Sequence, residues 1–434
     1  MLTPLITLLI AATGTSADIA SQQVPTGVLR MTRPKYELSD RNSAAGTTKA
    51  YGGSKGKASV QSGVPGVDSL ANWTGSFTSP GFDFFGNPQS VWPFEMVGRP
   101  PERGDTTRIN TPIIPVVVDL LGPDGKVAIF QGKPLTLDPA QFVKPVVQSP
   151  MFESFRYATG GNTQFNDAMF RTEFASRINS RHDDDDDGWH TLLNPKVKQP
   201  QRMQIPFGSW RFGVNPDGSI AFALVDESAF INALFPTTVP VDGSTVIGAA
   251  ELAGDMTTKD LSVLLFNNVY LFQGSVSNCC VLGFHTYDFE PGDNHNGNRE
   301  RRFVFSYASW ITPGFFAFGF EDITALSHEL NETFNDPFGD NATPWWLSVD
   351  PILGGSLCQN NLETGDVIEV LSSLPVFPIQ MHGMTYHPQN EAMFSWFAFQ
   401  SPSTAANGSY SFPDETTLTT LSPANLLPGC TPAK

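Results

Sequence analysis

Short apolar runs separated by turn signals dominate the chain from residue 112 onward. Residues 113–121 are apolar and rich in β-branched side chains. They are followed by a Gly-Pro-Asp-Gly turn at 122–125 and a second run at 126–130, a pattern that predicts a β-hairpin. Runs of the same kind predict further strands at residues 203–212, 219–225, 261–266, 268–272, 280–289 and 302–310.

Three segments have the three- and four-residue spacing of helices instead. Residues 160–178 predict an amphipathic helix with one buried face, and Asn162 or Thr163 is available as its N-cap. Residues 226–234 predict a short helix. The segment 322–337 predicts a third, with an apolar stripe at Ile323, Leu326, Leu330 and Phe334.

Many short strands with a few helices predict an α+β fold, in which β-rich elements surround the helices. Residues 18–100 are rich in Gly, Ser, Thr and Pro and have little periodicity. This composition favours a loop-rich leader or pro-region. We therefore expect one β-rich domain at residues 101–434, with a subdivision near residues 240–260 as an option.

Composition and charge indicate which classes of molecule the protein is not expected to bind. The chain has 434 residues, of which 40% are hydrophobic, so it can build a large core. Its net charge is −17. Nucleic acids and anionic membranes bind basic surfaces, so we expect neither as a partner. The sequence leaves the oligomeric state open.

The first 17 residues resemble a secretory signal peptide, with a short apolar core and small residues before the cleavage site. We therefore expect a secreted, extracellular protein. No later apolar run reaches the ~18 residues of a membrane span. Sequons for N-glycosylation are present at Asn72, Asn331, Asn341 and Asn407, and we take Asn72, Asn341 and Asn407 as candidate glycosylation sites.

The four cysteines agree with export, because an even, sparse set in a secreted chain suggests two disulfides. Cys279 and Cys280 are adjacent, and a bond between neighbours strains the backbone. We therefore expect each of them to pair with either Cys358 or Cys430, with the connectivity open.

The predicted helix at 322–337 contains the residues with the strongest chemical signal. His328 and Glu332 are four positions apart, so both project from one helix face and can bind one metal ion. Glu329 lies beside His328, where the general base of a zinc hydrolase lies in the pattern H-E-x-x-H.

Acidic residues nearby supply candidates for a third ligand. Pro337 disfavours helical geometry at Asp336, so Asp336 either folds back as a ligand or fixes the turn through a side-chain to backbone bond. Asp366 and Glu369 follow Gly365, which lets this loop approach another element closely. The other interpretation of this loop is a solvated acidic turn.

This helical segment resembles the active helix of zincin metallopeptidases. It is more closely similar to a family of secreted, largely uncharacterised proteins with the pattern H-E-x-x-E and a T-x-x-D-P ending. The similarity includes residues 165–168, 189–193, 358–369 and 387–392 and covers over half of the chain. The departure from ordinary zincins is Glu332, which replaces a histidine and weakens selectivity for zinc over harder divalent ions.

The resemblance implies a metallopeptidase-like hydrolase that acts on a peptide or protein. In this hypothesis His328, Glu332 and an acidic third ligand hold Zn²⁺, and Glu329 takes a proton from the attacking water. Two alternatives stay open. One is a non-enzymatic secreted or wall-associated protein with a carbohydrate-binding or structural role, and the other is a glycoside hydrolase with two carboxylates.

Overall fold

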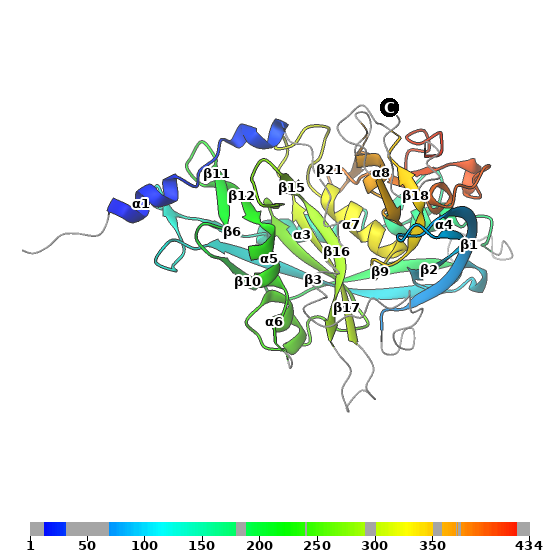
Figure 1. Ribbon diagram of the computed structural model, residues 1–434, viewed down its shortest axis with the longest axis horizontal. Coiled ribbons are helices and arrows are strands. Elements are labelled where there is room, and N and C mark those ends of the chain that lie inside the picture. Colours follow the sequence, from blue (N-terminus) through cyan, green and yellow to red (C-terminus); the bar gives the residue numbers. More distant parts are fainter. Residues whose placement is uncertain are drawn as a thin grey trace, which may run out of the picture.

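The computed structural model describes residues 13–31, 69–178, 188–238, 241–290, 301–349, 358–369, 371 and 375–422. Strands dominate these residues (Figure 1). Among them, the longest strand is β3 (Thr106–Leu120), with 15 residues, and the longest helix is α7 (Thr324–Asn335), with 12. The predicted α+β class is therefore wrong. The protein is a strand-rich fold with several sheets and short helices, because most helical patterns extend over only two or three turns.

A mixed seven-stranded sheet is built around β3. The N-terminal half of β3 pairs in parallel with β9 (His190–Val197) and its C-terminal half with β10 (Gln201–Ile205). On its other edge β3 pairs with β13 (Leu261–Asn267), and the sheet continues in the order β13-β17-β16. The remaining strands of this sheet are β6 (Thr136–Leu137), β16 (Gly283–Glu290) and β17 (Arg301–Trp310).

A second sheet has four strands in the order β11-β12-β14-β15. These are β11 (Trp210–Val214), β12 (Ile220–Asp226), β14 (Val269–Phe272) and β15 (Cys279–Val281). The other strands form two-stranded pairs: β1 (Asn72–Phe82) with β2 (Pro88–Val97), β4 (Ile129–Phe130) with β5 (Lys133–Pro134), β7 (Phe155–Arg156) with β8 (Asn162–Thr163), β18 (Ala342–Leu347) with β19 (Cys358–Asn361), β20 (Ile379–Met381) with β21 (Met384–Tyr386), and β22 (Glu391–Ala392) with β23 (Ser411–Phe412).

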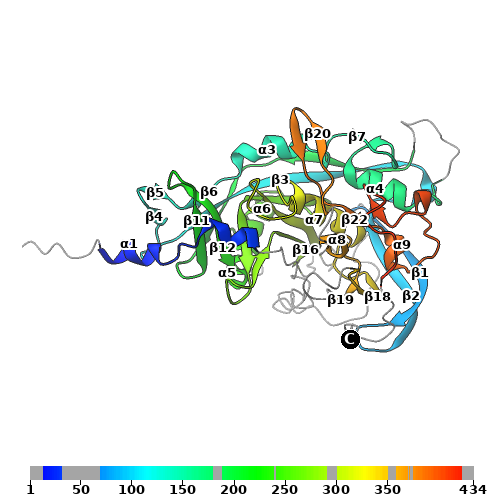
Figure 2. The same cartoon turned by 90° about the horizontal axis from the view of Figure 1, so that it is seen from above.

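Helix α7 lies in the middle of the molecule, against β16 and β17 and beside the β1–β2 hairpin (Figures 1 and 2). All twelve of its residues are buried. The other helices are α1 (Thr13–Ala20), α3 (Ala140–Val147), α4 (Phe165–Glu173), α5 (Glu227–Leu234), α6 (Val246–Leu252), α8 (Asp366–Glu369) and α9 (Phe394–Phe397), with 3₁₀ turns at Thr26–Met31, Pro101–Arg103 and Ala406–Gly408.

Helix α4 packs against α7. Asn166 Nδ2 donates to Asn331 Oδ1 (3.3 Å). The rings of Phe170 and Phe334 pack edge to face, with centroids 5.2 Å apart. The helix is shorter than predicted, because residues 162–163 form β8 and Gln164 is the N-cap. Eight of its nine residues are buried, so it presents more than one buried face.

Several strands also differ from the sequence predictions. The two runs of the expected hairpin at 113–130 contact each other through a single bridge between Leu121 and Val127. The first run belongs to β3, which joins the large sheet, and the end of the second forms β4, which pairs with β5. The expected strand at 203–212 is divided between β10 and β11. The expected strand at 280–289 is divided between β15 and β16, which belong to different sheets. The acidic run at 183–187 lies outside the described residues.

Residues expected to be a loop-rich leader contribute to the main core. The strands β1 and β2 form a hairpin whose side chains Trp73, Trp92 and Phe94 belong to the same hydrophobic cluster as Leu326 of α7. Whether residues before this hairpin are removed from the mature protein stays a prediction. Among the described helices, none combines the length and apolar character that a membrane crossing requires.

Candidate metal centre

The two ends of α7 hold the helix in a fixed place. At the N-terminal end, Thr324 Oγ1 donates to the carbonyl of His387 (2.7 Å), and the His387 ring contacts Asp322 (2.7 Å between Nδ1 and Oδ2). The helix ends at Asn335, and Asp336 is its C-cap, directly before Pro337. Between these ends, His328, Glu329 and Glu332 are buried, with 1–3% of each residue exposed.

A short loop brings α8 against α7. An added Cβ at Gly365 would lie 2.3 Å from His328 Nδ1, so only glycine allows the loop to pass this close to the ring. The Gly365 N–H donates to Glu332 Oε1 (3.1 Å) and its carbonyl accepts from Gln389 Nε2 (2.7 Å). The predicted close approach of this loop is confirmed, and it places Asp366 and Glu369 beside His328.

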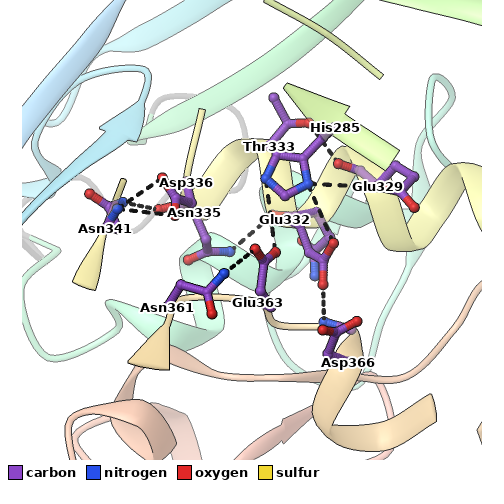
Figure 3. A network of polar contacts seen from close by, with 12 residues as sticks. His285, Glu329, Glu332, Thr333, Asn335, Asp336, Asn341, Asn361, Glu363 and Asp366 are labelled. Atoms are coloured by element: carbon purple, nitrogen blue, oxygen red, sulfur yellow. Dashed lines mark hydrogen bonds and ion pairs between the residues drawn. The ribbon is translucent and has the colours of Figure 1, made fainter. Parts of the chain in front are cut away.

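Strand β16 supplies a second imidazole. Gly283 leaves room for Glu329, because a Cβ there would lie 2.7 Å from Glu329 Cγ. His285, two positions along the strand, points toward the carboxylates of α7 (Figure 3). Its Nδ1 lies 3.6 Å from Glu329 Oε2 and 3.4 Å from Glu332 Oε2, and its Nε2 lies 3.9 Å from Glu363 Oε2.

The donor atoms form two groups. In the first, His328 Nε2 lies 3.6 Å from Asp366 Oδ1, and Glu369 completes the set. In the second, His285 faces Glu329 and Glu332. All donor atoms within each group lie within 4.8 Å of one another. Glu332 Oε2 also lies 3.1 Å from His328 Nε2, so it connects the two groups.

The electrostatics of this cluster are dominated by burial and mutual contact. Burial opposes the charged imidazolium, but Glu363 beside His285 and Glu332 beside His328 outweigh it and raise the pKa of both rings well above 6.5. Burial alone would raise the pKa of the Glu332 carboxyl, but the neighbouring His328 and His285 outweigh this effect and lower it. Burial raises the pKa of the carboxyls of Glu329, Glu369 and Glu391. Protons or cations must therefore offset the concentrated negative charge.

Asp336 is placed as a turn residue. Its Oδ1 accepts from the backbone N–H groups of Asp340 (3.0 Å) and Asn341 (3.2 Å), and its Oδ2 accepts from Asn341 (3.1 Å). Figure 3 shows it at the end of the helix with Asn335 and Asn341, and it belongs to neither donor group. Of the two sequence interpretations, the side-chain to backbone turn is the one observed.

Two members of the cluster have little signal in the sequence. His285 is a single histidine in an apolar strand, which suggests burial but no ligand role. Glu391 is fully buried on β22 and interacts with His328, yet it follows no motif that points to a metal. Both are brought to α7 by tertiary structure. Glu363 differs from these two residues. It lies two positions before Gly365, in the same acidic loop as Asp366 and Glu369, so the sequence pattern does mark it as a candidate.

The cysteines differ from the predicted pairing. The sulfurs of Cys279 and Cys280 are in close contact with each other across a cis peptide, whereas the sequence predicts that each pairs with Cys358 or Cys430. Cys358 is disulfide-bonded. Cys430 lies outside the described residues.

The candidate glycosylation sites differ in accessibility. Asn407 is exposed. Asn72 and Asn341 are buried, with 8% and 4% exposed, and Asn331 is fully buried in α7. The Asn341 amide donates to the carbonyls of Glu95 (2.7 Å) and Asn335 (2.5 Å). In this fold, only Asn407 among the three predicted sites presents an exposed amide.

Comparison with protein families, curated proteins and solved structures finds no match to this chain. The functional argument therefore rests on the geometry of the centre.

Proposed function

We propose that this protein is a divalent-metal-dependent hydrolase, with zinc as the first candidate ion. The observation that carries the proposal is the convergence of His328 of α7 with Asp366 and Glu369 of α8 in one buried group, with Glu332 Oε2 3.1 Å from His328 Nε2. These donors come from segments more than thirty residues apart in the chain. Their meeting is therefore a product of the fold.

The donor spacing fits an ion. Ligands about 2.0–2.2 Å from zinc at tetrahedral angles lie about 3.3–3.6 Å from one another. His328 Nε2 lies 3.1 Å from Glu332 Oε2 and 3.6 Å from Asp366 Oδ1, close to this spacing. In addition, Glu369 Oε2 is buried and accepts no hydrogen bond from any described residue. A carboxylate oxygen in this position requires a proton or a cation as its partner.

The residues divide into those that hold the ion and one that moves a proton. His328, Glu332, Asp366 and Glu369 would hold the ion, and the Gly365 N–H fixes the orientation of Glu332. When bound, zinc would polarise a carbonyl and lower the pKa of a coordinated water to ~7. Glu329 Oε1 lies 4.0 Å from His328 Nε2, beside the donor group. We assign it the role of proton acceptor from that water.

Secretion and a peptide substrate are parts of the same proposal. The disulfide-bonded state of Cys358 supports an oxidising compartment. The geometry of the donors supports hydrolysis but does not specify which kind of bond is hydrolysed. The choice of a peptide substrate therefore rests on the resemblance to zincin helices.

Replacement of Glu329 by Gln tests the assignment. The side chain keeps its shape but cannot accept the proton, so cleavage of a peptide library should fall about 10²–10⁴-fold. The ion beside His328, Asp366 and Glu369 should be retained, because Glu329 is not a member of that donor group. Glu153→Gln is the matched control, because Glu153 is an exposed glutamate paired with His382. We would measure metal by elemental analysis and cleavage with and without a chelator.

Two results would contradict the proposal. Full activity in Glu329→Gln would remove Glu329 from the mechanism. Absence of stoichiometric metal in folded wild-type protein, even after incubation with Zn²⁺ or Mn²⁺, would remove the metal centre itself.

A second candidate is a non-enzymatic secreted protein that the ion stabilises. The burial of every donor favours it, because closed metal sites are typically structural and catalytic sites keep a position open. In this case a chelator would lower the melting temperature, and the metal-loaded protein would not cleave any peptide.

A further inference from the structure

We propose that the centre holds two divalent cations, one in each donor group, with Glu332 shared between them. The first cation is that of the proposed function, on which this inference therefore rests. The second would be held by His285 of β16 together with Glu329 and Glu332 of α7.

The two groups have different imidazoles, and one carboxylate oxygen lies close to both of them. Glu332 Oε2 lies 3.1 Å from His328 Nε2 and 3.4 Å from His285 Nδ1. One oxygen that faces two imidazoles is placed to bind an ion on each side. A single ion within the first group would leave His285 with no ligand role.

The distances in the second group are those of ligands around an ion. His285 Nδ1 is 3.4 Å from Glu332 Oε2 and 3.6 Å from Glu329 Oε2. Direct hydrogen bonds between charged groups are about 2.7–2.9 Å long, whereas zinc ligands lie about 3.3–3.6 Å apart. The second group therefore has the spacing of a coordination shell.

Charge supplies an independent argument. Six carboxyl groups surround the two histidines, each at most 8% exposed: Glu329, Glu332, Glu363, Asp366, Glu369 and Glu391. One divalent cation offsets two negative charges and a second offsets two more. A buried carboxylate without a partner is costly, so in the state in which these carboxyls are ionised the cluster is better matched to two cations than to one.

Glu329 can serve both proposals with different oxygens. Its Oε2 faces His285 at 3.6 Å and would bind the second cation. Its Oε1 faces His328 at 4.0 Å and stays available for the proton. The carboxylate-rich donor set with one imidazole per group suits Zn²⁺ or Mn²⁺, and paired ions are a recurrent device in metal-dependent hydrolysis.

Metal stoichiometry of the full chain tests the inference. Metal-free protein would be titrated with Zn²⁺ and with Mn²⁺, and bound metal counted by elemental analysis. We expect two ions per chain for wild type, one for His285→Gln and one for His328→Gln. His382→Gln is the control and should keep two, because His382 is exposed and pairs with Glu153 outside the donor groups.

Electron paramagnetic resonance of the Mn²⁺ forms adds a readout that is independent of activity. Two neighbouring Mn²⁺ ions interact magnetically, so wild type should lose the six-line signal of an isolated ion. His285→Gln should recover that signal. Circular dichroism would verify that each variant is folded. If a variant is not, the stoichiometry and spectrum of wild type still decide between one ion and two.

The outcomes separate this inference from the proposed function. One ion per wild-type chain, lost in both histidine variants, would indicate a single shared site and overturn the two-cation centre alone. Two ions retained in His285→Gln would overturn it as well. No bound ion in folded wild type would overturn both proposals.

Discussion

The position of the His328 ring depends on the missing side chain of Gly365. A Cβ at this position would lie 2.3 Å from Nδ1 and 2.6 Å from Cε1. Gly365→Ala should therefore displace the ring and weaken metal binding about 10–100-fold, the usual effect of disturbing a group that orients a ligand. Competition with a fluorescent chelator measures the change. Gly27→Ala is the control, since an added Cβ there contacts nothing within 4 Å.

An unchanged metal affinity in Gly365→Ala would show that the ring can shift without loss. In that case His328 would not be a ligand in the arrangement described.

Glu173 is a buried carboxyl outside the metal centre. Its Oε1 accepts a hydrogen bond from the Phe394 N–H, and Oε2 has no hydrogen-bond partner among the described residues. Burial raises its pKa to about 8, against the opposing effect of the Phe394 bond. Between pH 4.5 and about 8 the folded protein thus keeps a proton that the unfolded chain releases. The free energy of unfolding falls as the pH rises through this window.

Glu173→Gln should remove this pH dependence, because the amide keeps an acceptor oxygen and does not ionise. At pH 8 the variant should exceed wild type by about 3–5 kcal/mol in free energy of unfolding. At pH 4 the two should nearly match. Urea denaturation at both pH values measures the difference, and an equal gap at both would contradict the argument.

At the scale of the element, α7 shows what helical spacing can and cannot predict. The four-residue spacing placed His328 and Glu332 on one face correctly. The apolar stripe did not indicate that the other faces are buried too. Polar side chains cover them and contact other parts of the protein. Thr333 Oγ1 contacts Ser306 Oγ (3.0 Å), and Asn331 accepts from Asn166. A sequence pattern cannot distinguish such internal partners from water.

The end of α7 depends on Asp336. Its carboxylate accepts from two backbone N–H groups and belongs to neither donor group. We expect Asp336→Ala to lower the free energy of unfolding by about 1–3 kcal/mol, the usual result of leaving buried donors unpaired. Urea denaturation measures this loss. Elemental analysis should show unchanged metal content, and loss of an ion would instead make Asp336 a ligand.

At the scale of the whole molecule, local patterns predicted elements better than their assembly. Strands β12, β13, β14 and β17 agree closely with the apolar runs that predicted them. The pairing of β3 with β9 and β10 in parallel joins segments about 85 residues apart. No local signal specifies such pairing. The same limit explains why the sequence does not indicate His285 and Glu391 as parts of the cluster. Asp366 differs, because the neighbouring Gly365 indicates a loop that can come close to another element.

The β1–β2 hairpin constrains how the chain can be processed. Because β2 packs against α7 and Trp73 belongs to the main core, excision of residues 1–100 would remove one wall from around α7. A proteolytic cut that leaves this hairpin in place therefore has to fall upstream of Ser69. Sequencing the amino terminus of the protein purified from its natural source would show whether such a cut occurs and where.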